Sequence, residues 1–178
     1  MRAAPYAQPR MSVLRYSPPA QRDLAASMYT VAGWVSGSFM IPKLRIFTEF
    51  LNAPQEFFKL KGVHLPGLDK EIPFFVLQRA SIIFIVPGDD EALDSPVAGK
   101  RMEREVSCAF ANGVVSGTLH LLKGVRVSDF VFSHAGLFVL RNCSIFIRGG
   151  ATPEVRHNVL HAMVNSDRLI GVSEPRFV

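Results

Sequence analysis

Residues 33–39 read Gly33-Trp-Val-Ser-Gly-Ser-Phe39, and eighty residues later residues 113–119 read Gly113-Val-Val-Ser-Gly-Thr-Leu119. The likeness continues without a gap over residues 33–63 and 113–143. Eight positions are identical, namely 33, 35, 36, 37, 43, 50, 58 and 60 in the first stretch. A repeat of this length predicts a duplicated folding unit, so both parts of the chain are expected to share one architecture.

The repeated stretch alternates in polarity with a period of two, which is typical of a half-buried β-strand. The predicted inward face carries Val31, Val35, Phe39 and Ile41 in the first copy and Ala111, Val115, Leu119 and Leu121 in the second. Glycines recur on that same face, at positions 33, 37, 113 and 117. Because the same side chains are missing in both copies, we expect sharp strand bending or close backbone approach there, as in a small barrel.

A short helical turn is expected next, at residues 45–52 and 125–132. Its hydroxyl-carboxylate pairs, Thr48-Glu49 and Ser128-Asp129, fit a cap followed by an acid near the positive end of the helix dipole. A strand is then expected at residues 57–63 and 137–143, followed by a closing hairpin at residues 74–87 and 162–172. The Thr152-Pro153-Glu154 sequence is typical of a helix start, so residues 153–161 remain open between helix and strand.

These elements divide the chain into two modules with short connections. The predicted segments are a flexible basic N-terminal tail (1–26), a first barrel module (27–88), an acidic linker (89–100), a second barrel module (101–174) and a tail (175–178). The predicted fold class is mainly β, with two tandem Sm/SH3-like small β-barrel modules, each with a short helical turn, packed as a pseudo-dimer.

The net charge of +5 is concentrated at one end of the chain. Four arginines and no acidic residue lie in residues 1–22, so the remaining residues carry only +1. A nucleic-acid-binding body usually carries a clear positive excess, which this one lacks. The tail is expected to be a solvated leader, or alternatively a weak anion-binding arm.

Cys108 and Cys143 are too few for a disulfide scaffold and lack metal-type spacing, which favours a reducing, cytoplasmic compartment. Cys143 aligns with Val63 of the first copy and is therefore expected to be a small buried apolar residue. The longest apolar window, residues 72–86, is interrupted by Gln78-Arg79 and is too short to cross a bilayer. No membrane insertion is therefore expected.

No motif for a nucleophile elbow, a phosphate-binding loop or a dinucleotide site occurs in the sequence. His157 and His161 have a spacing that suits a metal on a helix, but a third ligand is not offered nearby. We therefore expect no catalytic residues, no metal and no cofactor, and the protein is not expected to be an enzyme.

The Gly-x-Val-x-Gly strand, the Arg-Ile-Phe-Thr-Glu-Phe turn at residues 45–50 and the Phe58-Lys-Leu60 strand resemble a bacterial domain family of unknown function, in two copies. The closing hairpin at residues 76–87 is similar to that of Sm-like (Hfq-type) small β-barrels. That resemblance implies a five-stranded, strongly bent barrel in each module. It also implies an RNA contact at the hairpin turn, where this chain carries Gln78 and Arg79 in one copy and Asn165 and Ser166 in the other.

The expected function is that of a non-catalytic cytoplasmic interaction or regulatory module, which binds a protein partner through a strand edge or a groove between the modules. The residues predicted to bind that partner are those that differ between the copies: Trp34, Gln78, Arg79, Asn165 and Arg168. Packing of Trp34 inside the protein is the alternative for that residue. The alternative function is Sm-like RNA binding through Lys59, Lys61 and Arg79. A second copy of the chain is a further candidate partner.

Overall fold

The computed structural model describes residues 20–88, 93, 101–149 and 152–175. Their strands form one ten-stranded antiparallel sheet in the order β10-β6-β7-β8-β9-β5-β1-β2-β3-β4. The prediction of a mainly β protein is confirmed. The sheet is open, so β4 and β10 are its two edge strands.

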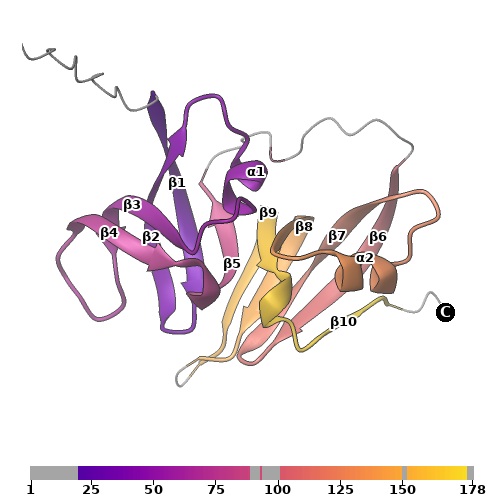
Figure 1. The fold of residues 1–178 in the computed structure, drawn as a ribbon. Coiled ribbons are helices and arrows are strands. Elements are labelled where there is room, and N and C mark those ends of the chain that lie inside the picture. Colours follow the sequence, from indigo (N-terminus) through magenta and orange to yellow (C-terminus); the bar gives the residue numbers. More distant parts are fainter. Residues whose placement is uncertain (1–19, 89–92, 94–100, 150–151, 176–178) are drawn as a thin grey trace, which may run out of the picture.

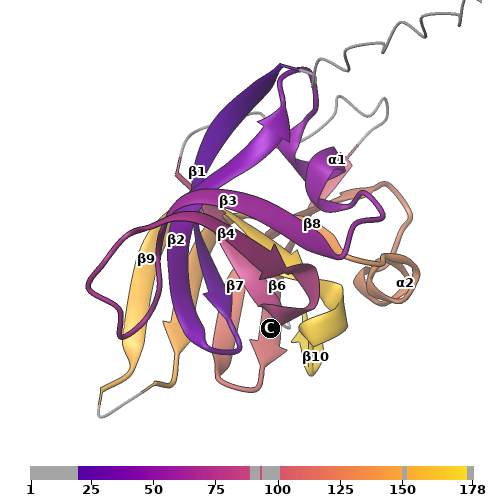
Figure 2. The same cartoon turned by 60° about the vertical axis from the view of Figure 1, so that its left-hand side comes forward.

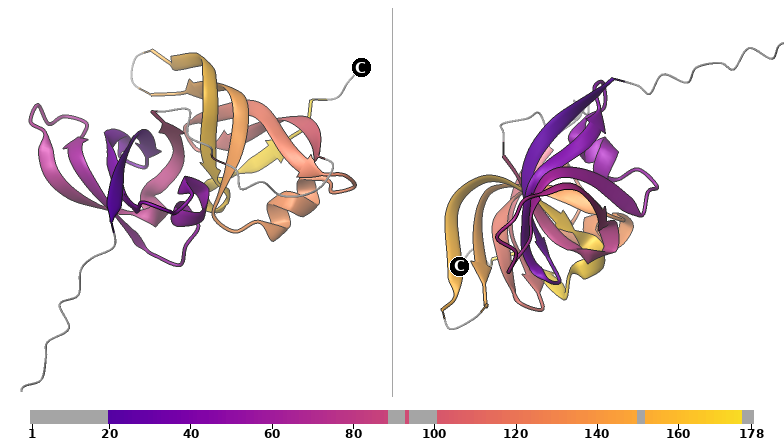
Figure 3. Two further views of the ribbon diagram at one scale, coloured as in Figure 1. Left: turned by 90° about the horizontal axis from the view of Figure 1, so that it is seen from above. Right: turned by 90° about the vertical axis from the view of Figure 1, so that its left-hand side faces the viewer.

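The sheet has two halves that follow one another in the sequence. The first half contains β1 (Gln21–Thr30), β2 (Gly33–Pro42), α1 (Phe47–Leu51), β3 (Phe57–His64), β4 (Ile72–Gln78), the 3-10 turn η1 (Arg79–Ser81) and β5 (Ile82–Pro87). The second half contains β6 (Arg101–Phe110), β7 (Gly113–Leu122), α2 (Val127–Ser133), β8 (Leu137–Ile147), β9 (Glu154–Asn165), the 3-10 turn η2 (Ser166–Arg168) and β10 (Gly171–Ser173). Figure 1 shows the halves side by side, with β5 and β9 between them, and the sheet is strongly twisted (Figures 2 and 3).

Strand pairing follows the same register in both halves, eighty residues apart. Leu24 of β1 faces Phe39 of β2, and Arg104 of β6 faces Leu119 of β7. The pairing of β2 with β3 shifts at position 37, and that of β7 with β8 shifts at position 117. The aligned residues therefore occupy corresponding places in the sheet.

Glycine is required at those register shifts because another strand comes close. A Cβ atom added to Gly117 would lie 2.8 Å from the carbonyl oxygen of Arg141 and 3.0 Å from Cys143 Sγ. At Gly37 the added atom would lie 2.8 Å from a methyl group of Val63. The expected close approach is confirmed at both positions.

The sequence pattern does not predict the first strand. The boundary placed at residue 26 falls inside β1, in which Leu24, Ala26 and Met28 are buried. Alanines at positions 25 and 26 hide the alternation, because one is exposed and the other buried. Val31, which the alternation placed on the inward face, lies in the turn between β1 and β2 and is exposed.

Residues 154–165 form strand β9, which decides the alternative left open at residues 153–161. Pairing with β8 extends from Leu137 opposite Asn165 to Ile147 opposite Glu154. These long-range hydrogen bonds outweigh the local helix-start signal at Pro153, as tertiary context commonly outweighs propensity.

The two helices form close to their expected places, but the predicted caps are wrong. Their N-cap residues are Ile46 and Arg126, and neither makes a side-chain cap hydrogen bond. The helices begin at the buried residues Phe47 and Val127, so the hydroxyl residues fall one position inside them. The acids Glu49 and Asp129 lie in the first turn, as expected from the helix dipole.

Each half completes the hydrophobic core of the other. One buried cluster, built around Phe39 and Phe58 of the first half, also includes Leu137 and Met163 from the second. The other cluster belongs mainly to the second half and includes Phe84 of β5. The two halves therefore form one packed body.

Residues 1–19 of the predicted tail (1–26) and most of the predicted linker lie outside the described residues. Within that linker, Leu93 is 2% exposed and belongs to the cluster around Phe39. No helix in the described part of the chain combines the length and apolar character needed to cross a membrane.

Candidate interaction sites

The residues predicted to bind a partner at the second hairpin turn make contacts within the chain. The buried Asn165 donates a hydrogen bond from Nδ2 to the carbonyl of Ile82, at 2.8 Å, across the boundary between the halves. Arg168 donates to the carbonyl of Ala80 in the η1 turn. These two side chains therefore hold the hairpin turns of the two halves together.

Arg79 and Gln78, at the first hairpin turn, differ in what they offer to a partner. The half-buried Arg79 side chain donates to the carbonyl of Ala53, at 3.3 Å, and its backbone N–H donates to the carbonyl of Glu56, at 2.8 Å. Gln78 is exposed at the end of β4, opposite Phe57. Arg79 therefore fixes the turn, whereas Gln78 lies on the surface.

Trp34 packs at the boundary between the halves, which was the alternative given for it. Its ring lies against Tyr29 and Phe84, with centroid separations of 5.3 and 5.5 Å. Its Nε1 donates to Glu154 Oε2, at 2.8 Å, and the Arg156 guanidinium lies 3.9 Å from the ring centroid. The tryptophan thus joins β2 to β9 by a hydrogen bond and a cation–π contact.

Asn52, which the sequence did not single out, makes two hydrogen bonds to the backbone of one residue in the other half. Its side chain donates to the carbonyl of Leu137 and accepts from the N–H of Leu137, both at 2.8 Å. The aligned residue in the second copy is Phe132, which is exposed. A polar-to-apolar difference between the copies is thus the sequence signal that could have identified it.

Lys59 and Lys61, predicted for nucleic-acid binding, share a face of the sheet with exposed apolar side chains. In the pairing of β3 with β4, Lys59 faces Val76 and Lys61 faces Phe74. Phe57, Phe74 and Val76 are each about half exposed. Lys61 also pairs with Asp23, at 3.2 Å. We name Phe57, Lys59, Lys61, Phe74 and Val76 the edge surface.

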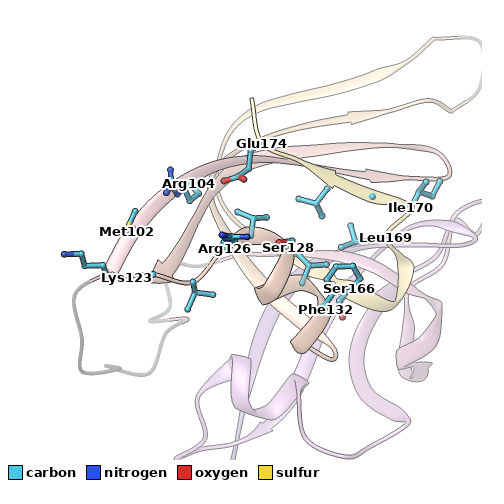
Figure 4. A pocket seen from close by; sticks show the side chains of 16 residues that line it. Met102, Arg104, Lys123, Arg126, Ser128, Phe132, Ser166, Leu169, Ile170 and Glu174 are labelled. Atoms are coloured by element: carbon cyan, nitrogen blue, oxygen red, sulfur yellow. The ribbon is translucent and has the colours of Figure 1, made fainter. Parts of the chain in front are cut away.

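Two cavities lie on or beside the second half. One, of about 370 Å³, has Thr48 and Asn52 of the first half and Phe130 and His134 of the second in its wall, and is therefore the groove between the halves. His134 stacks on Phe130 there, with the ring centroids 4.9 Å apart. The other cavity, of about 790 Å³, lies between α2, β10 and β6 (Figure 4).

The cysteines and histidines do not converge on a reactive centre. Cys108 and Cys143 are buried free thiols, and burial raises the pKa of each to about 12. His157 and His161 lie on β9, near Ser144 and Arg141. Across the described residues, no group of three or more histidine, cysteine or acidic side chains is placed to hold a metal ion.

The fold is an open antiparallel β-sheet. Its two halves are joined by side-chain hydrogen bonds from residues that differ between the copies. Comparison with known proteins found no matching family model, curated protein or solved structure.

Proposed function

We propose that the chain is a non-catalytic cytoplasmic interaction module, made of two tandem small-barrel units, that adds an extended segment of a protein partner to the edge of β4. The observation that carries this proposal is the edge surface. β4 ends the sheet, and its outward side chains Phe74 and Val76 are half exposed beside Phe57. An open edge offers backbone hydrogen bonds, and flanking apolar side chains supply specificity.

β4 is better suited to this role than β10, the other edge strand. It has seven residues, whereas β10 has three. The lysines at positions 59 and 61 favour a partner segment that alternates apolar and acidic residues. Two buried free thiols agree with a reducing compartment.

The test is a selection of binding peptides from a random library displayed on phage, followed by amide hydrogen exchange with the selected peptide. We expect added protection of amides in residues 72–78. Val76→Lys should weaken binding by about tenfold or more, because edge lysines oppose strand addition.

Val155→Lys is the matched control, since Val76 and Val155 are both 48% exposed. It lies on β9, far from β4 in the strand order, where Val155 pairs with Phe146 of β8, and should bind like the wild type. Protection that appears elsewhere in the sheet, or equal loss in the two variants, would contradict the proposal.

The second candidate function is binding of single-stranded RNA to the same face. It is favoured by Phe74 lying directly opposite Lys61, since aromatic and basic side chains together can hold a base and its phosphate. The Lys61–Asp23 ion pair and the body charge of only +1 weigh against it.

A chain starting at Ala20 removes Arg2, Arg10 and Arg15 of the tail but leaves β1 intact, and so isolates this face. Salt-dependent binding of a uridine oligonucleotide to that chain, lost in Lys59→Ala, would favour RNA. No salt-dependent binding would exclude it.

A further inference from the structure

The cavity of about 790 Å³ beside α2 has an apolar floor and a basic rim (Figure 4). The floor is the set of buried or half-buried lining residues Val127, Val131, Leu169 and Val172, and the rim is the set of exposed lining residues Arg104, Lys123 and Arg126. Glu174 is the one acid among the described residues that line it. Phe132 and Ile170 line it as well and are 91% and 72% exposed. The volume is in the range typical of ligand sites.

The corresponding place in the first half is filled. By strand register, Arg104 corresponds to Leu24, since each faces the equivalent residue of the next strand. Val172 faces Cys108 as Ile85 faces Met28. The first-half residues at these positions, and Phe47 at the position of Val127, are all buried in one cluster. The cavity therefore exists because smaller or charged residues replace this core.

One side chain from outside the strands completes the filled cluster. Leu93, six residues after the end of β5, is 2% exposed and lies in the same cluster as Leu24 and Phe47. Its sequence context is acidic, with Asp89-Asp90-Glu91 before it and Asp94 after it. Leu93 thus shows that a leucine with acidic neighbours in the sequence can complete this buried cluster.

We propose that the cavity beside α2 binds an acidic peptide segment of a partner protein, which inserts a leucine-like side chain onto Val127, Val131 and Val172. Three basic side chains against one acid give the rim a positive excess, which complements carboxylates on both sides of the inserted residue. Arg104, Lys123 and Arg126 form no ion pair with any other residue that the structure describes. The proposal is independent of strand addition at β4, because the two sites use different residues.

The test is a fluorescence anisotropy titration of the full chain with a labelled peptide of the sequence of residues 88–97, Gly-Asp-Asp-Glu-Ala-Leu-Asp-Ser-Pro-Val. We expect saturable binding that weakens as salt is added. Replacing leucine by serine in the peptide should weaken binding by about tenfold or more. The double variant Arg104→Glu, Arg126→Glu should have a similar effect.

Two variants make the result specific to the cavity. Val127→Phe introduces the residue found in the first half, so it should fill the cavity and remove binding while the fold is kept. Lys43→Glu, Lys70→Glu has the same net charge as the arginine double variant but alters exposed residues outside both proposed sites, and should bind normally. Circular dichroism checks that each variant is folded.

Four outcomes would overturn the proposal: no binding by the wild type, equal binding by the Val127→Phe variant, saturable binding of dodecanoate without binding of the peptide, or peptide binding only after Phe177→Ser. The third would show a lipid site. The fourth would show that the chain's own C-terminal residues occupy the cavity.

Discussion

The two cysteines show how burial decides the chemistry of a residue. Cys108 and Cys143 have essentially no exposed surface. A thiolate in an apolar surrounding loses its hydration, so loss of solvent is the largest cause of the raised pKa of both thiols. They are therefore packing residues, which the sequence predicted for Cys143.

These thiols predict an alkaline loss of stability. The folded protein keeps both protons up to about pH 12, whereas the unfolded chain releases them near pH 9.0. Between these values the unfolded state binds fewer protons, so the free energy of unfolding falls as pH rises. Urea unfolding between pH 8 and 11 should show a steeper fall for the wild type than for Cys108→Ala, Cys143→Ala. Parallel curves would disprove the assignment.

Three of the side chains that differ between the copies hold the two halves together. Trp34, Asn165 and Arg168 all reach across the boundary between the halves. The sequence could identify these positions as unusual, because the aligned residues are different. It could not show that the partner of each is in the same chain, since the contacts join residues 83 to 120 positions apart.

At the scale of strands, the register shifts at Gly37 and Gly117 are the features that the repeat preserved most strictly. Each shift brings a carbonyl of the neighbouring strand within about 3 Å of where a side chain would begin. The strand alternation and both glycines were predictable because they depend on local pattern. Strand β9 was not, because its pairing with β8 outweighs the local signal at Pro153.

Gly117→Ala should destabilise the protein by about 1–3 kcal/mol, because the new methyl group must displace backbone. Its Cβ would lie 2.8 Å from the Arg141 carbonyl oxygen. Gly171→Ala is the control, since an added Cβ there has no described atom within 4 Å. Urea midpoints measure the difference. A Gly117→Ala variant as stable as Gly171→Ala would show that the strands can separate at no cost.

At the scale of the whole molecule, the boundary between the halves is itself hydrophobic core. β5 and β9 pair at Phe84–Val164 and Ile85–Met163, and the two strands supply residues to both buried clusters. A strand buried on both faces cannot be removed without exposing two cores. The halves are therefore expected to unfold together.

Asn52→Ala should lower the stability of the entire protein by about 1–3 kcal/mol, because it removes two hydrogen bonds to the backbone of the buried Leu137. Fluorescence of Trp34 and far-ultraviolet circular dichroism should report one coincident urea transition, shifted to lower urea in the variant.

Gln55→Ala is the matched control, because that side chain donates one hydrogen bond to Phe50 within the first half. It should shift the midpoint less than Asn52→Ala. Two separate transitions, with Trp34 changing first, would instead mean that the halves are independent units.

The sequence by itself determined the parts of this protein that depend on local pattern: the repeated β-strands, the short helices, the glycines at the register shifts and the buried thiol of Cys143. Tertiary structure alone decided that β5 pairs with β9 and that Leu93 completes the buried cluster of the first half. It also decided that the corresponding place in the second half is a cavity. The physical reason is that these features depend on contacts between residues far apart in the chain. The copies differ at aligned positions such as Leu24 and Arg104. Whether such a difference opens a cavity can be decided only when the neighbouring residues in space are known.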